Sequence, residues 1–209
     1  MANTNAPFGF RQYQGGAGGA PTFAQTARRI AAGNTTAIYY GDPVMPVVST
    51  ANGYITQASP GTTTLAGIFV GCKYLSTSQK RTVWSNFWPG ADATGDVEAY
   101  VIDDPNTRFV VQGNSTTFNI SGTLSTYTSS PVGQYAQFAI GTGNTSTGIS
   151  GAYLNSLGTT VTFPFVVTDL ITQPPGGPGT DPTSASNWVV VGFNNEWLRS
   201  NGAGPTGIS

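Results

Sequence analysis

The side chains that could do acid–base chemistry in this chain are carboxylates, because its 209 residues include nine Asp and Glu and no histidine. The absence of histidine excludes every mechanism that uses an imidazole as a base or as a zinc ligand. Asp103 and Asp104 are adjacent at the end of VEAYVIDDPN, where a strand would point them to opposite faces. Since Pro105 comes directly after them, we expect a turn here rather than a pair of catalytic acids.

Asp92, Asp96 and Glu98 form a second group of carboxylates, with the alternating spacing of a calcium-binding loop. Their segment, PGADATGDVE, offers fewer oxygen ligands than an EF-hand loop requires, so we predict no metal and no other cofactor. The single cysteine, Cys72, lies in the apolar segment GIFVGCKYL. We expect a buried, unreactive thiol there, although a neighbouring Lys73 would favour the thiolate in an open site.

Aromatic residues suggest a different function, because sugar rings stack on exposed tryptophans. The chain has four tryptophans, Trp84, Trp88, Trp188 and Trp197, together with nine tyrosines. Residues of these types more often lie in a core or at an interface, so a sugar-binding platform is the alternative interpretation.

Short strands must position these residues, because β-branched and aromatic segments bounded by Gly, Pro, Asn or Asp recur along most of the chain. The spacing predicts a single all-β domain over residues 36–195, either a β-sandwich or jelly roll or a β-barrel. A Pro/Gly-rich connector at 172–186 is expected to be exposed and extended. The expected strands are 36–40, 44–48, 54–57, 65–75, 82–87, 97–102, 108–112, 117–120, 134–140, 160–170 and 188–193.

The two ends of the chain have a different composition. We expect residues 1–35 to form an N-terminal arm with at most a short helix within Thr22–Ala32, because GGAGGAP cannot hold regular structure. Residues 196–209 are expected to form a C-terminal tail. Anchor-type side chains in both segments predict that they contact neighbouring subunits rather than their own domain. These candidate partner-contact residues are Phe8, Phe10, Arg11, Tyr13, Phe23, Arg28, Arg29, Trp197 and Arg199.

Charge is scarce in this chain, with 8% charged residues and a net charge of −1. The sequence has no basic cluster for nucleic acid, no apolar run long enough for a membrane span and no signal-peptide pattern, so we expect neither nucleic acid nor a membrane as a partner. One cysteine fits synthesis in a reducing cytoplasm. Phe109–Thr168 contains no Asp, Glu, Lys or Arg. Because free surfaces and sheet edges normally carry charge, this stretch predicts surfaces that an assembly covers.

Residues 38–74 resemble a known family of virion proteins. The motifs YYGDPVMPVV, GYITQAS and LAGIFVGCKY resemble the turn, hairpin and strand of head decoration and cement proteins of tailed phages. NFWPG at 86–90 and VIDDPNTRFVVQ are similar to the corresponding later segments of larger, podovirus-associated head proteins. The resemblance implies a mostly β protein, often trimeric, with Gly41 and Gly53 in turns and no catalytic residue. Its place would be the outer surface of the capsid, and its partners the major capsid protein and further copies of itself.

Two other classes of function remain open at the level of sequence. A tail-associated or receptor-binding β module would share the composition, but it should expose an aromatic cluster and bind carbohydrate. A glycosidase would need two carboxylates that face each other across a cleft. The exposure of the tryptophans and the placement of the acids therefore distinguish the three classes.

Overall fold

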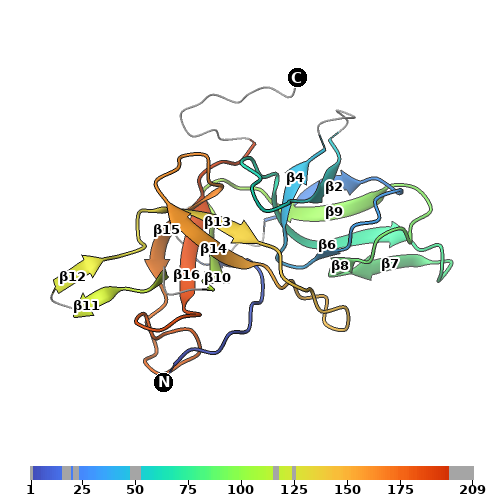
Figure 1. Cartoon of the computed structure of the whole chain (residues 1–209). Coiled ribbons are helices and arrows are strands. Elements are labelled where there is room, and N and C mark those ends of the chain that lie inside the picture. The colour runs from blue at the N-terminus through green and yellow to red at the C-terminus, as the bar shows by residue number, and fades with distance from the viewer. Residues whose placement is uncertain are drawn as a thin grey trace.

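The computed structural model describes residues 2–15, 20, 24–47, 53–114, 118–123 and 126–197, with the side chains of 121–129 left aside. It is an all-β protein in which two six-stranded antiparallel sheets pack as a sandwich (Figure 1). The predicted all-β sandwich is confirmed, and because both sheets are open the barrel alternative is not the observed one. Within the described residues no helix is long and apolar enough to cross a membrane.

The first sheet, called sheet A, contains most of the second half of the chain. Its core-facing residues come from alternate strand positions and pack against Ile68 and Ile102 of the other sheet, which places the first apolar core between the sheets. The strand order is β1 (Arg11–Gln14), β10 (Arg108–Gln112), β16 (Trp188–Phe193), β15 (Phe165–Leu170), β13 (Tyr135–Ala139) and β14 (Tyr153–Gly158).

The second sheet, called sheet B, curls around a core of its own. Its two edges approach each other where Arg29 forms a parallel bridge with Tyr54. A ladder of β3 (Ile38–Tyr39) and β8 (Phe87–Trp88) covers this second core and buries Trp88 completely. The strand order is β2 (Thr26–Ile30), β9 (Val97–Ile102), β6 (Gly67–Leu75), β4 (Pro43–Pro46) and β5 (Ile55–Gln57), with β7 (Thr82–Ser85) also paired to β6.

A separate hairpin of β11 (Ser121–Thr123) and β12 (Thr126–Ser129) projects from sheet A on the side away from sheet B (Figure 1). The predicted strand at 117–120 is wrong for its described part, residues 118–120, which precede this hairpin without joining a sheet. The predicted strand at 160–170 begins only at Phe165, because Thr160–Phe163 forms a turn closed by the Phe163 amide.

The N-terminal segment is not an arm over its described residues. The expected short helix is wrong, since Thr26–Ile30 is strand β2 and pairs antiparallel with β9, while β1 pairs with β10. The alternation of Thr26, Arg28 and Ile30 with exposed positions is the period of a strand. Gly9 allows the chain to turn into the core at a φ of +73°, where a Cβ would lie 2.7 Å from the Ser150 Cβ.

The Pro/Gly-rich connector is folded back rather than extended. Residues 172–176 are exposed as expected, but Gly179 and Thr180 are buried in a series of turns. The Trp188 amide donates to the Gly179 carbonyl at 2.8 Å, which joins the connector to the start of β16. The connector therefore packs as part of the sandwich.

Candidate functional site

The described candidate partner-contact residues from the N-terminal end fold onto their own domain. Phe10 is 1% exposed and stacks on Phe165 with 4.5 Å between ring centroids, so it is a core residue. Phe8 packs edge-on against Trp188. Because the core buries Phe10, the expectation that it binds a neighbour is wrong for this conformation, whereas Phe8 is only partly buried and its contact with a neighbour stays a prediction.

The remaining candidates differ in exposure. The Arg11 guanidinium lies 4.2 Å above the Tyr40 ring, whereas Tyr13 is 42% exposed and Arg29 is exposed on β2. Phe23 and Arg199 lie outside the described residues. Tyr13 and Arg29 thus remain the accessible members of the predicted set within the described chain.

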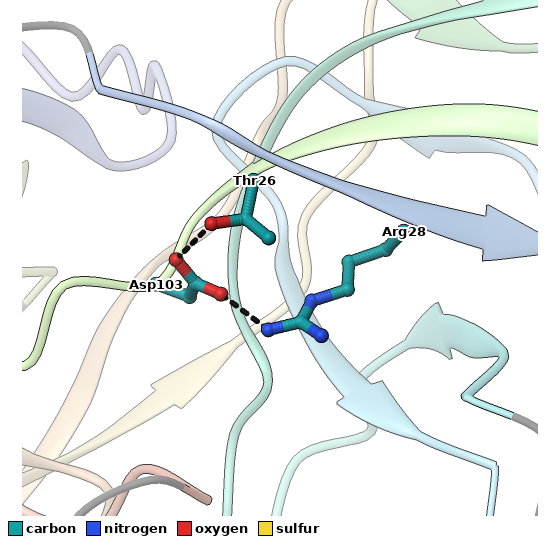
Figure 2. A network of polar contacts seen from close by, with 3 residues as sticks. All are labelled: Thr26, Arg28 and Asp103. Atoms are coloured by element: carbon teal, nitrogen blue, oxygen red, sulfur yellow. Dashed lines mark hydrogen bonds and ion pairs between the residues drawn. The ribbon is translucent and has the colours of Figure 1, made fainter.

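A polar network joins strand β2 to Asp103, the residue directly after β9 (Figure 2). Asp103 accepts from Arg28 Nη2 at 2.5 Å and from Thr26 Oγ1 at 2.7 Å. The Trp197 ring lies 4.3 Å from the Arg28 guanidinium carbon, in a cation–π contact. Arg28 and Trp197, both expected to bind neighbours, contact each other within the chain, and their binding to a neighbour stays a prediction.

The two adjacent aspartates have different structural roles. Asp104 caps the predicted turn, because its Oδ1 accepts from the Asn106 amide at 2.9 Å. Asp103 is buried against Arg28 and does not begin that turn with its side chain, so the turn prediction is confirmed for Asp104 alone. The pair is not arranged as two acids across a cleft.

The other candidate ligands and nucleophile are also engaged separately. Asp92 accepts from Ser76 Oγ, Asp96 accepts from the Tyr54 hydroxyl, and Glu98 forms an ion pair with Lys73. The described part of the chain contains no group of three or more His, Cys, Asp or Glu placed to hold a metal. Burial raises the pKa of the Cys72 thiol to about 12, which keeps it protonated.

Asp42 is a buried carboxylate for which the sequence gives only a turn signal. Its Oδ2 accepts from the Tyr39 amide at 2.8 Å and from Gln57 Nε2 at 2.7 Å, and its Oδ1 accepts from Ser150 Oγ at 2.5 Å. Burial raises the pKa of Asp42, and the hydrogen bonds oppose this shift only in part. Because its partners come from three separate segments, Asp42 stabilises the junction between the sheets.

The four tryptophans differ sharply in exposure. Trp88 is fully buried, Trp188 packs against Phe8, and Trp197 lies on Arg28, whereas Trp84 on β7 is 67% exposed. The Trp84 ring is parallel to the Tyr100 ring, with 3° between the planes and 6.0 Å between centroids. An exposed tryptophan supported by a partly buried tyrosine is the kind of aromatic surface that a carbohydrate-binding module should show.

A shallow hollow of about 550 Å³ lies beside this aromatic pair, and we call it the Trp84 hollow. Its walls combine the two rings with neutral polar side chains, and its floor includes a glycine of β6. The lining residues are Gln25, Val70, Gly71, Cys72, Trp84, Ser85, Asn86 and Tyr100.

A second surface feature is the neutral region, which we define as residues 130–163 with β13 and β14. It includes exposed threonines and asparagines, one exposed glycine, Gly133, and no charged residue. Val132 and Val161 are 45% and 54% exposed in its turns. Ala136, Phe138 and Leu154 of the same region face the first core, so only part of the charge-free stretch is surface.

The fold defines the class of the chain as an all-β sandwich, and it carries a neutral surface and one open aromatic hollow. Comparisons with protein-family models, with curated protein sequences and with solved structures found no match for it. The functional argument therefore depends on the described surfaces themselves.

Proposed function

We propose that the chain is a structural protein of a tailed-phage virion, a decoration or cement protein that binds the outer surface of the head and clamps neighbouring capsomers. Its partners are the major capsid protein and further copies of the chain in a trimer. It is made in the host cytoplasm and then joins the capsid. Its activity is binding rather than catalysis.

The observation that carries this proposal is the composition of the neutral region. Its exposed turns present hydroxyl, amide and glycine groups and the two valines, with no charged side chain. Covering a hydroxyl or an amide costs far less free energy than covering an unpaired charge. Such a surface suits permanent packing against another protein, and the resemblance of residues 38–74 to head decoration proteins suggests which assembly.

Internal hydrogen bonds hold the turns of the neutral region in place. Asn144 Oδ1 accepts from the amides of Ser146 and Thr147 at 2.9 and 3.1 Å, and Gln134 Nε2 donates to the Ser130 carbonyl at 2.8 Å. Because these turns are already ordered, binding through them loses less conformational entropy. This supports a clamp made by the β domain, since the N-terminal segment folds onto its own sheets.

The test is attachment to phage heads that lack the protein. We expect the double variant Val132→Asp with Val161→Asp to bind such heads at least about tenfold more weakly, because each substitution places a charge where the contact must exclude water. Leu75→Asp is the matched control, since Leu75 is 46% exposed but lies at the end of β6, outside the neutral region. Co-sedimentation measures binding, and averaged electron micrographs locate the chain.

Wild type and the Leu75→Asp variant should both add regular density to the outer shell. Density on the tail, or none on the particle, would refute the proposal of a head protein. Tight binding by the folded double variant would instead move the contact away from the neutral region. Sedimentation equilibrium of the free protein should show a trimer. If the chain were a monomer both in solution and on the head, the proposal that it binds further copies of itself would be wrong.

A further inference from the structure

The Trp84 hollow has features that attachment to a head does not explain. Trp84 is the most exposed of the large hydrophobic side chains in the described chain, although burying such a ring would normally stabilise a fold. Its orientation is fixed by the parallel Tyr100 ring and by Lys73, whose Nζ lies 5.0 Å from the Trp84 centroid. The ring is therefore both accessible and held in place.

The hollow exists because of the local geometry of β6. The pairing of β6 with β9 shifts register between Phe69 and Gly71, which brings Gly71 opposite Tyr100. A Cβ on Gly71 would lie 3.0 Å from the Ser85 carbonyl, so a larger residue would press against the backbone of Ser85 and Asn86, two residues that line the hollow. Glycine at this position keeps the space beside Trp84 open.

A loop of sheet A holds one side chain of the lining, Asn86, in place. Asn86, between β7 and β8, donates through Nδ2 to the Thr147 carbonyl at 2.6 Å. Gly148 lies against the same side chain, where a Cβ would overlap the Asn86 amide. The loop after β13 thus reaches across to sheet B and fixes the amide at the edge of the hollow.

The chemistry of the lining favours an uncharged, hydroxyl-rich ligand. Gln25, Ser85 and Asn86 carry neutral groups that both donate and accept hydrogen bonds. Lys73 is paired with Glu98 at 3.5 Å, so the adjacent charges compensate each other and offer no site for a phosphate backbone. Besides the two rings, Val70 and Cys72 add apolar groups to the lining, so the hollow combines an apolar face with convergent hydrogen-bonding side chains, as a ligand with both kinds of surface requires.

We infer that the Trp84 hollow binds a carbohydrate, with the apolar face of a pyranose ring against Trp84 and its hydroxyl groups at Gln25, Ser85 and Asn86. The concave shape, the ordered aromatic platform and the few convergent polar groups are the usual elements of a small-ligand site. This inference goes beyond the proposed head attachment and does not depend on it. A chain repeated over a particle surface would add many weak sugar contacts into strong binding.

The experiment uses the labelled full chain on an array of immobilised bacterial polysaccharides and oligosaccharides, followed by a titration with the free form of any retained glycan. We expect Trp84→Ala to weaken binding by at least about tenfold, the size of one lost stacking contact, and Trp84→Phe to retain part of it. Tyr13→Ala is the matched control, because Tyr13 is another exposed aromatic residue but lies on β1 of sheet A. It should bind as wild type does.

Two outcomes would overturn the inference: no glycan retained above the level of Trp84→Ala, or a glycan bound equally by wild type and Trp84→Ala. Loss of head attachment in Trp84→Ala without any glycan binding would also overturn it and would assign the ring to a protein contact. The double variant Val132→Asp with Val161→Asp, which we expect to bind heads weakly, should still bind the glycan as wild type does. The two proposals can therefore fail separately.

Discussion

The two halves of the sandwich hold their polar groups in different ways. Around sheet B, charged side chains take part, as in the Arg28–Asp103 pair and the buried Asp42. Around sheet A, side-chain amides take this role: buried Gln112 donates to the carbonyls of Thr4 and Ser186 and accepts from the Ala6 amide. Asn194 similarly donates to the carbonyls of Val161 and Phe163.

The difference explains how a long stretch can lack charge and still keep its loops ordered. An amide can donate and accept at once, so a single Asn or Gln satisfies backbone groups without bringing a charge into the interior. The half held by amides should therefore respond little to pH. The half held by carboxylates should respond to it.

The largest effect should come from placing a charge in the amide-held half. Gln112→Glu keeps the shape of the side chain but turns a donor toward two carbonyls into a carboxylate oxygen, and we expect a loss of about 3 to 5 kcal/mol in unfolding free energy. Urea denaturation measures it. Gln79→Glu is the control, since exposed Gln79 uses only its Oε1, toward Arg81, and should change little. A loss below about 1 kcal/mol for Gln112→Glu would contradict the role assigned to the amide.

A smaller effect should result from removing the buried carboxylate. Asp42→Ala leaves three donors, from Tyr39, Gln57 and Ser150, without their acceptor, and we expect a loss of about 3 kcal/mol. Asp42→Asn should cost less, because its amide can donate to Ser150 Oγ while its oxygen accepts from the other two groups. Equal losses in the two variants would show that these hydrogen bonds contribute little.

The same carboxylate should make stability depend on pH. Since burial raises the pKa of Asp42 above its ordinary value of 3.8, the folded state binds more protons than the unfolded state between these two pKa values. Stability from Asp42 is thus fully present below pH 3.8 and is lost as pH rises through the folded pKa. The difference in melting temperature between wild type and Asp42→Asn should become smaller as pH rises through the folded pKa of Asp42. A difference that grows with pH would contradict a raised pKa.

The smallest effect concerns the network of Figure 2. Asp103→Asn removes the charge that faces Arg28, and we expect the unfolding free energy to fall by about 1 to 2 kcal/mol. Because the pair is mostly buried, added salt should weaken its contribution to wild-type stability only modestly. Glu98→Gln is the control in the exposed pair with Lys73 and should stay within about 0.5 kcal/mol. Denaturation at two salt concentrations would compare them, and equal losses would remove the distinction between the pairs.

The sequence predicts the fold best where local pattern and partner agree. Strands β9, β10 and β16 match their expected ranges residue for residue, because each is a β-branched segment closed by turn residues. The sequence does not predict strand β2, because its pairing with β9, some seventy positions along the chain, overrides the weak strand propensity of TARRI. The sequence does not predict strand β14 either, for the same reason: YLNSLG has little β propensity of its own and becomes a strand by pairing with β13.

The candidate sites depend even more on tertiary structure. Trp84 and Trp88 are four residues apart in one segment, yet one is open and the other is fully buried, because the strand breaks between β7 and β8. Asp42 is buried by Ser150, a partner 108 positions away. Composition does indicate the neutral surface, since the absence of charge is a property of the sequence itself.

The position of β16 also determines when the chain can fold. This strand, among the last residues described, lies between β10 and β15 and is the only link between the two parts of sheet A in the strand order. The first residues depend on the same late segment, because Asn3 exchanges hydrogen bonds with the backbone of Asp181 and Phe8 packs on Trp188. During synthesis sheet A cannot close until β16 has left the ribosome. Folding of the sandwich should therefore wait for that strand and proceed at the slow rate typical of proteins dominated by contacts distant in sequence.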